Sequence, residues 1–180
     1  MNAQIQSLPV TAYVALGANL GEAQKTVREA IQALDHLPAT RLVLGSSLYL
    51  SEPVGCAEQQ PAYVNAVAQV STTLSAEQLL QQLLLLEHHY GRQRAFHNAP
   101  RTLDLDLLLY GDMQMHVPGL TLPHPRMHER AFVLLPLLEI APQVTIPGLG
   151  PAADCLTDDV AAQGICRLGS DMNCLGAGNA

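Results

Sequence analysis

Two aspartates in the segment RTLDLD, residues 101–106, are the side chains of this sequence best suited to hold a metal ion. In a β-strand Asp104 and Asp106 point to one face, a few ångströms apart, while Leu103, Leu105, Leu107 and Leu109 point to the other. Two neighbouring carboxylates raise each other's pKa unless a cation lies between them. Oxygen ligands of this type, completed by water and phosphate, suit Mg²⁺. The alternative is the ordinary polar face of an edge strand.

Positive charge gathers around this pair. Nine residues are Lys or Arg, Lys25 is the only lysine, and five of the arginines fall between residues 92 and 130. They are Arg92, Arg94, Arg101, Arg126 and Arg130. Because the planar guanidinium fork fits phosphate oxygens, the stretch indicates an anionic ligand. A scatter of unrelated surface arginines is the alternative.

The segment LTLPHPRMHERAF predicts a helix over 125–139 that begins with two cations. Arg126 and Arg130 lie one turn apart at its start, where positive charge opposes the helix dipole, so a bound anion would explain them. His124 just before the helix is placed to donate to a phosphate oxygen. A zinc pair of His124 and His128 is disfavoured, because no third ligand has suitable spacing and HExxH is absent.

Glu87 is a carboxylate on the apolar stripe of a helix predicted over 75–90, aligned with Leu80, Leu83 and Tyr90. It either meets a polar pocket or lies where the stripe leaves the core. The chain has neither GxxxxGK[ST] nor GxGxxG. A bound nucleotide would therefore be held by arginine side chains and metal-bound carboxylates.

Composition narrows the class of protein. A net charge of −7 argues against general attraction to nucleic acid, and 48% hydrophobic residues suffice for a globular core. The N-terminal residues do not resemble a signal peptide, and no apolar run approaches the ~18 residues of a membrane span. We therefore expect a cytoplasmic protein with no membrane partner. The four cysteines form no CxxC pair and are expected to be free thiols.

The elements that must position these side chains follow one order: strand, helix, strand, strand, helix, strand. Their ranges are 11–16, 22–37, 41–50, 63–73, 75–90 and 103–110. This order predicts an α+β protein with a ferredoxin-like βαββαβ core, an antiparallel sheet and both helices on one face. The helix over 125–139 and a weaker one over 151–162 would cover the second face and give an α/β/α sandwich.

One domain over residues 1–165 fits the length of 180 residues, with 166–180 as a poorly ordered tail rich in Gly, Ala and Asn. The connections 51–62 and 91–102 are longer than usual and are expected to be binding loops or lids, with harmless insertions as the alternative. In the strand over 63–73, Tyr63 and Asn65 share one face.

Five segments together resemble a known family. They are YVALGANLG at 13–21, SEPVG leading to QPAYVNA at 60–66, LEHHYGRQR at 86–94, APRTLDLDLLLYG at 99–111 and LTLPHPRMHERAFVLLPLLEIAP at 120–142. In this order they resemble 6-hydroxymethyl-7,8-dihydropterin pyrophosphokinase of folate biosynthesis, over about residues 11–150. The resemblance implies transfer of the β,γ-diphosphate of ATP to the hydroxymethyl group of the pterin, with release of AMP and two Mg²⁺ ions as cofactors.

The resemblance also implies roles for individual residues. The metal ligands and catalytic aspartates would be Asp104 and Asp106, with Arg92 and Arg101 as catalytic cations on the phosphates. The nucleotide would be bound by Glu87, Arg94, Thr121, His124 and Arg130. The pterin would be bound by Ser51, Val54, Tyr63, Asn65 and Phe132, with Tyr63 and Phe132 as the stacking rings. Partners would be these two small molecules, with no nucleic acid, and the chain would be a monomer.

Two other functions stay open from the residues alone. A ferredoxin-like sensing module would bind a small molecule without catalysis, and a metal-dependent phosphoesterase would hydrolyse ATP without a pterin. A sensor has no need of paired aspartates beside arginines.

Overall fold

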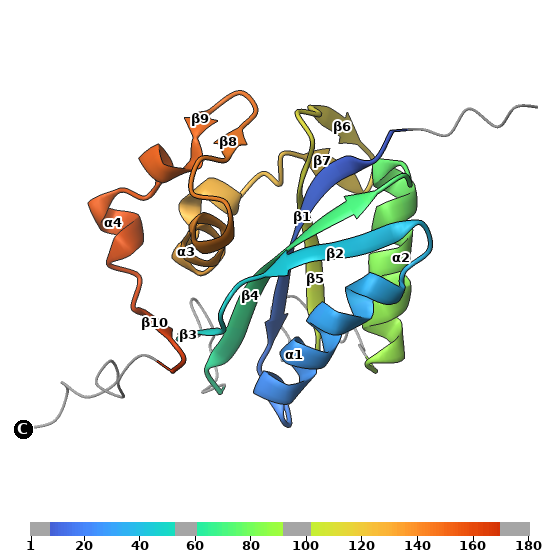
Figure 1. Ribbon diagram of the computed structural model, residues 1–180. Helices are drawn as coiled ribbons and strands as arrows, with labels where there is room; N and C mark the ends of the chain where they lie inside the picture. Colours follow the sequence, from blue (N-terminus) through green and yellow to red (C-terminus); the bar gives the residue numbers. More distant parts are fainter. Residues whose placement is uncertain (1–7, 53–60, 92–101, 170–180) are drawn as a thin grey trace, which may run out of the picture.

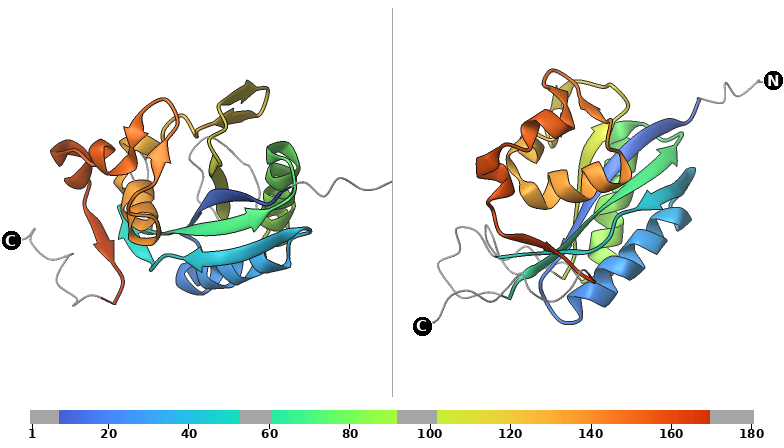
Figure 2. Two further views of the ribbon diagram at one scale, coloured as in Figure 1. Left: turned by 45° about the horizontal axis from the view of Figure 1, so that its top comes forward. Right: turned by 60° about the vertical axis from the view of Figure 1, so that its left-hand side comes forward.

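The computed structural model describes residues 8–52, 61–91 and 102–169, which form three layers. An antiparallel sheet lies between two helices on one face and a helix with short C-terminal elements on the other (Figure 1). Figure 2 shows the same separation from two further directions. The mixed α/β class with an antiparallel sheet is therefore confirmed.

The main sheet has β1 (Val10–Ala18) near its centre, between β4 and β5. Beyond β4 lie two shorter strands that pair with successive parts of it, and a last strand pairs with one of these. From edge to edge the strands are β10 (Ile165–Arg167), β3 (Tyr49–Ser51), β4 (Tyr63–Thr72), β1 and β5 (Asp104–Tyr110), and β2 (Thr40–Gly45) also pairs with β4.

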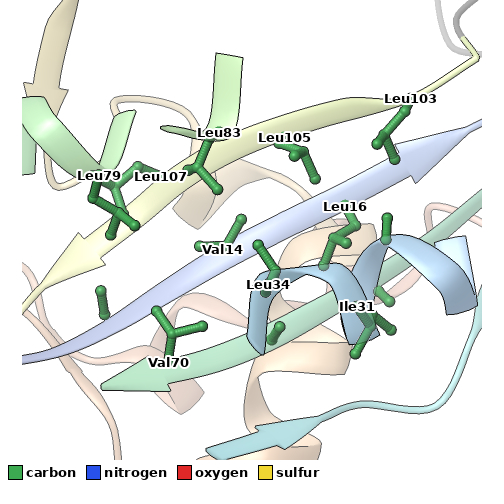
Figure 3. Close-up of a cluster of buried hydrophobic side chains, with 14 of the residues drawn as sticks. Val14, Leu16, Ile31, Leu34, Val70, Leu79, Leu83, Leu103, Leu105 and Leu107 are labelled. Carbon is green, nitrogen blue, oxygen red and sulfur yellow. The ribbon is translucent and has the colours of Figure 1, made fainter. Parts of the chain in front are cut away.

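The first face of the sheet is covered by α1 (Ala23–Ala33) and α2 (Ala76–His89). Alternate residues of the strands, such as Val14 and Leu16, point into this apolar layer and are buried (Figure 3). A capping box begins α2, since the Ser75 hydroxyl accepts from the Gln78 amide at 3.2 Å and Oε1 of Gln78 accepts from the Ser75 amide at 2.9 Å.

The second face is covered by α3 (Ala131–Ile140) and by the C-terminal elements. These are the 3₁₀ turns Met127–Glu129 and Ala152–Cys155, the short α4 (Asp158–Ala161), and the hairpin of β8 (Thr145–Ile146) and β9 (Gly150–Pro151). A further hairpin of β6 (Met115–Val117) and β7 (Leu120–Leu122) follows β5. None of the described helices has the length and apolar character needed to cross a membrane.

The strand predicted over 41–50 is interrupted, and the reason is one serine. Ser46 accepts the Val67 amide on its hydroxyl at 2.9 Å and donates its own amide to the Val67 carbonyl at 2.9 Å. The side chain thereby takes the place of a backbone group in the ladder. The chain leaves β4 there and returns to it as β3.

The prediction that Leu109 shares a face with Leu107 is wrong, because β5 contains a bulge. Leu107 lies opposite Val14 and Leu109 lies opposite Tyr13, so Leu108 is an extra residue between them. Leu107 packs in the layer under α1 and α2, whereas Leu108 and Leu109 pack against the α3 side. One strand thus supplies large side chains to both cores.

The helix predicted over 125–139 begins later than expected, at Ala131. Arg130 is extended, with φ −121° and ψ 112°, and Arg126 precedes a separate 3₁₀ turn. The two arginines therefore do not sit one turn apart on a helix start. The expected boundary at residue 165 also falls inside an element, because Cys166 and Arg167 belong to β10.

Candidate active site

Asp104 and Asp106 lie on β5 with their side chains on the face opposite α1 and α2, as the alternation predicts. Both are partly exposed, while Leu105 between them is 2% exposed. Their neighbours on β1 are small, since Asp104 lies opposite Gly17 and Asp106 opposite Ala15. The carboxylates therefore border a strip of small, partly exposed residues, Ala15 and Gly17, on this face of the sheet.

Asn65 lies on the far side of this strip. It is opposite Gly17 in the β1–β4 ladder, so Asn65, Gly17 and Asp104 form one row across three adjacent strands. Two strand spacings separate the amide from the carboxylate, about 10 Å between backbones. A Cβ at Gly17 would lie 3.5 Å from Oδ1 of Asn65, so the glycine keeps the space between the two polar groups open.

The Asn65 amide is fixed by groups from β3 and β4. Its Nδ2 donates to Oγ of Ser51 at 2.9 Å and lies 3.3 Å from the Tyr63 carbonyl oxygen and 3.4 Å from that of Tyr49. Asn65 is 5% exposed and Ser51 is 6% exposed, so this side of the strip is buried. With Nδ2 occupied, Oδ1 faces the strip over Gly17 as an acceptor.

A pocket of about 660 Å³ opens beside Asp106, between β5 and the β6–β7 hairpin. Its polar lining includes Asp106, Thr121 and His124, together with His116. His116 Nδ1 lies 2.9 Å from the Thr121 hydroxyl, which fixes that hydroxyl at the wall. The volume falls in the range of small-molecule sites.

His124 is positioned by backbone groups. Its amide donates to the carbonyl of Leu108, the extra residue of the bulge, at 2.9 Å, and its Nδ1 accepts from the Arg126 amide at 3.3 Å. The neutral ring therefore carries its proton on Nε2. Burial lowers the pKa of His124, the Asp106 carboxylate opposes this, and the charge of Arg130 lowers the pKa further.

Arg130 and Phe132 lie at the start of α3. The guanidinium carbon of Arg130 is 5.5 Å from the centroid of the Phe132 ring, a cation–π contact. Burial and the charge of Arg126 lower the pKa of Arg130, against the Asp106 carboxylate, but a guanidinium stays protonated in proteins. It is a half-buried cation near the aspartates.

Glu87 is placed differently from the other predicted nucleotide residues. It is 1% exposed, and its Oε1 accepts the Leu105 amide at 2.7 Å. It reaches β5 from the α2 side, whereas Asp104 and Asp106 face away from α2. Glu87 therefore lies on the α2 side of β5, and the two aspartates lie on its opposite side.

Four predicted site residues, Val54, Arg92, Arg94 and Arg101, lie outside the described residues. Asp106, Thr121 and His124 meet at the pocket, and Ser51, Tyr63 and Asn65 meet where β3 and β4 pair. Glu87 lies on the other face of β5, and Phe132 lies against Arg130. Gly17 was not predicted. Its place in the period-2 alternation of β1 was available from the sequence, but its register between two other strands was not.

This fold, with paired carboxylates beside a small-molecule pocket, is suited to a transferase of charged groups. The family model for 7,8-dihydro-6-hydroxymethylpterin-pyrophosphokinase (HPPK) matches residues 13–142. The chain belongs to this family and is a pyrophosphokinase, as the resemblance implied.

Relatives of known name agree. The chain is 47% identical over 135 residues to the 2-amino-4-hydroxy-6-hydroxymethyldihydropteridine pyrophosphokinase of Pseudomonas aeruginosa, covering 75% of this chain and 83% of that protein. It is 46% identical over 138 residues to that of Haemophilus influenzae, covering 77% and 86%.

Solved structures share the fold. A Plasmodium falciparum HPPK-DHPS variant with pterin and p-hydroxybenzoate gives a TM-score of 0.69 at 13% identity, covering 92% of this chain and 48% of that chain. The chain therefore spans about half the length of that protein.

Proposed function

We propose that this enzyme transfers the β,γ-diphosphate of ATP to the hydroxymethyl oxygen of 6-hydroxymethyl-7,8-dihydropterin, as a step of folate biosynthesis. The observation that carries the proposal is the row Asn65–Gly17–Asp104 beside the pocket at Asp106. It offers a fixed amide for a flat polar substrate on one side and carboxylates beside a pocket on the other.

ATP is assigned to the pocket between β5 and the β6–β7 hairpin. His124, with its proton on Nε2, is suited to donate to a phosphate oxygen, and Arg130 adds a partly desolvated positive charge. Thr121 offers a hydroxyl at the wall. Glu87 supports the site from below through Leu105. Arg92, Arg94 and Arg101 stay assigned to the phosphates on the resemblance.

The residues present fit Mg²⁺. Among the described residues no group of three or more His, Cys, Asp or Glu side chains is arranged to hold a metal ion. Mg²⁺ is commonly held by one or two carboxylates and completed by waters and substrate phosphates, which matches Asp104 and Asp106. We propose two ions there. Bound Mg²⁺ would neutralise charge on the phosphates and favour ionisation of the attacking hydroxyl.

The pterin is assigned to the Asn65 side of the strip. Asn65 presents an oriented amide, and Ser51 fixes that amide. Tyr63 on β4 and Phe132 on α3 supply aromatic rings, and a flat heteroaromatic substrate gains from stacking on such rings. Val54 remains a proposed contributor on the resemblance.

The protein's part in the reaction is placement and charge. Asn65 orients the pterin so that its hydroxymethyl group points along the row toward Asp104. The hydroxyl gives its proton to solvent water, and its oxygen bonds to the β-phosphorus as the bond from that phosphorus to the bridging oxygen of the α-phosphate breaks. AMP leaves with that oxygen. His124 and Arg130 stabilise the charge on the phosphates.

We infer a ferredoxin-like core from the order β2–β4–β1–β5 and the two helices on one face. We also propose that the chain acts as one domain that extends past residue 165 to the end of β10, in the cytoplasm and as a monomer, without nucleic-acid partners.

The test is AMP formation with and without the pterin, in the presence of Mg²⁺. Pterin-dependent AMP release supports the proposal. AMP release that is unchanged without the pterin, or ADP as product, would overturn it. ATP hydrolysis without acceptor would favour a phosphoesterase, and pterin binding without turnover would favour a sensing module.

A further inference from the structure

The start of α3 has no cap from its own neighbours, and a glutamine from the C-terminal segment takes that place. Oε1 of Gln163 accepts the Ala131 amide at 3.0 Å, and its Nε2 donates to the Glu129 carbonyl at 2.8 Å. The amide of Gln163 thus spans the extended residue Arg130. Phe132 follows directly, so Gln163 fixes the end of the helix that carries this ring.

The other end of α3 is fixed by Glu139. Its carboxylate accepts from the Ser47 hydroxyl and the Tyr49 hydroxyl, both at 2.7 Å, and from the Ser47 amide at 3.1 Å. Arg167 on β10 completes the group, since its Nη2 lies 3.2 Å from Oε1 of Glu139 and 2.6 Å from Oγ of Ser47. Glu139 therefore joins α3 to the start of β3 and to β10.

The strand held in this way is the one that orients Asn65. β10 pairs with all three residues of β3, and the Leu168 amide donates to the Leu48 carbonyl at 2.8 Å. The Ser51 hydroxyl and the Tyr49 carbonyl on β3 both face Nδ2 of Asn65. A shift of β3 relative to α3 would move Asn65 relative to Phe132.

We propose that Gln163, Glu139 and Arg167 are positioning residues that set the separation of two walls of the pterin site, Phe132 on α3 and Asn65 on β4. The inference rests on the proposed function. None of the three touches the substrate in this assignment; each acts through the placement of α3 against β3. Two of them, Gln163 and Arg167, lie beyond the residues 13–142 that the family model matches.

The separation matters because contact between flat groups falls off steeply with distance. A gap of about 0.5–1 Å already loses a quarter to a half of the dispersion attraction. Among the described residues, those that line the nucleotide pocket include none from α3, β3 or β10. Loosening the Glu139 end of α3 should therefore weaken pterin binding and leave nucleotide binding nearly unchanged. Loss of the Gln163 contacts also frees Arg130, which is assigned to the phosphates, and should weaken both ligands.

The test compares Gln163→Leu, Arg167→Met and Glu139→Gln in the full chain. Calorimetry gives two dissociation constants: that of a non-hydrolysable ATP analogue with Mg²⁺, and that of the pterin at a saturating concentration of this analogue. For Glu139→Gln and Arg167→Met we expect the pterin constant to rise about three- to tenfold, as the net loss of about one hydrogen bond would give, and the analogue constant to stay within about twofold. Gln163→Leu should raise both constants, because Gln163 also holds Arg130 in place.

Two further variants serve as controls. Arg167→Lys keeps a cation within reach of Glu139 and should restore most of the pterin affinity. Lys25→Met removes a cation from an exposed ion pair on α1, where Nζ lies 3.5 Å from Glu22, and should change neither constant. A merely structural role for Arg167 predicts equal losses for both ligands.

Unchanged pterin affinity in all three variants, with a wild-type protein that binds the pterin, would overturn the inference alone. Equal weakening of both ligands in Glu139→Gln and Arg167→Met would also overturn it. A wild-type protein that binds no pterin would overturn the proposed function, and the inference with it.

Discussion

Substitution of Asp104 or Asp106 should lower turnover without a large change in the free energy of unfolding. Both side chains are partly exposed on β5, so Asp104→Asn or Asp106→Asn should change the free energy of unfolding by no more than about 1 kcal/mol. Each loses a negative charge at the phosphates, and we expect turnover to fall at least ~100-fold. AMP formation at saturating Mg²⁺ and thermal unfolding of the same samples check both parts. Turnover near that of the wild type would refute the assignment.

Gly17 keeps the strip between Asn65 and Asp104 open. Its backbone is not in the left-handed region, and an added Cβ meets nothing closer than 3.5 Å, so Gly17→Ala should fold without strain. We expect the free energy of unfolding to stay equal or rise by up to about 1 kcal/mol, because the unfolded chain loses freedom. Turnover should fall at least about tenfold, since the methyl group enters the space assigned to the substrate.

Urea unfolding and AMP formation measured on Gly17→Ala test these two directions together. A variant that is as active as the wild type would show that the substrate does not cross β1. A variant that is inactive because it is destabilised would show instead that the glycine is needed for folding.

Individual residues were predictable where a short pattern decides their direction. Period-2 alternation put Asp104, Asp106 and Asn65 on the correct sides of their strands. It failed at Leu109, because the bulge at Leu108 shifts the register and nothing in the run of leucines marks it. Gly17 was not predicted as a site residue, because its position between Asn65 and Asp104 depends on the pairing of β1 with both β4 and β5.

The Glu139 carboxylate links the stability of α3 and β3 to pH. Burial raises its pKa, but hydrogen bonds from Tyr49 and Ser47 and the charge of Arg167 outweigh burial and hold the pKa below its ordinary value. Burial and the hydrogen bond to Glu139 raise the pKa of Tyr49 to about 12, so the tyrosine stays a donor at neutral pH.

A lowered pKa in the folded state fixes the sign of the pH effect. The stability that ionised Glu139 contributes is complete above its unfolded-state pKa and is lost as pH falls through the folded-state pKa. The difference in free energy of unfolding between the wild type and Glu139→Gln should therefore shrink between about pH 5 and pH 3. Urea titrations of both proteins across this range measure it, and a difference that is constant with pH would contradict it.

Elements were predictable in proportion to how local their signals are. The helix over 75–90 has a capping box, in which Gln78 follows Ser75 by three positions, and an apolar stripe, and the structure has α2 at Ala76–His89. The start of α3 depends on Gln163, whose partner Ala131 is 32 positions away. The break between β2 and β3 depends on Ser46 and Val67, which meet only after β4 has formed. Such contacts leave no signature in a short window.

The whole molecule should open from its edges inward. β1 and β4 each have strands on both sides, and the buried layers of both faces meet on them. Their amides should exchange with solvent only through near-global unfolding, while those of β10 at the sheet edge should exchange faster. Hydrogen exchange read by mass spectrometry checks this order. Equal protection of β10 and β1 would contradict it.

The layered architecture as a whole was predictable from the element order, but the end of the sheet was not. β10 has three residues and no strong alternation, and it pairs with β3 from more than 110 positions away. The expected tail from residue 166 therefore missed a strand that borders the Asn65 side of the site. The roles of Arg92, Arg94 and Arg101 at the phosphates stay a prediction, because these residues lie outside the described part of the chain.

The bulge at Leu108 makes β5 unequally sensitive to in-frame deletion. Loss of Leu108 would bring Leu107 and Leu109 next to each other, opposite Val14 and Tyr13, and every remaining side chain would keep its face. Loss of Leu105 would instead put Asp104 and Asp106 on opposite faces of the strand. Yet the Leu108 carbonyl also receives the His124 amide. Deletion of Leu108 would therefore leave Asp104 and Asp106 on their face but remove the backbone hydrogen bond that positions His124. The aspartates and the histidine of the phosphate site thus depend on different residues of β5.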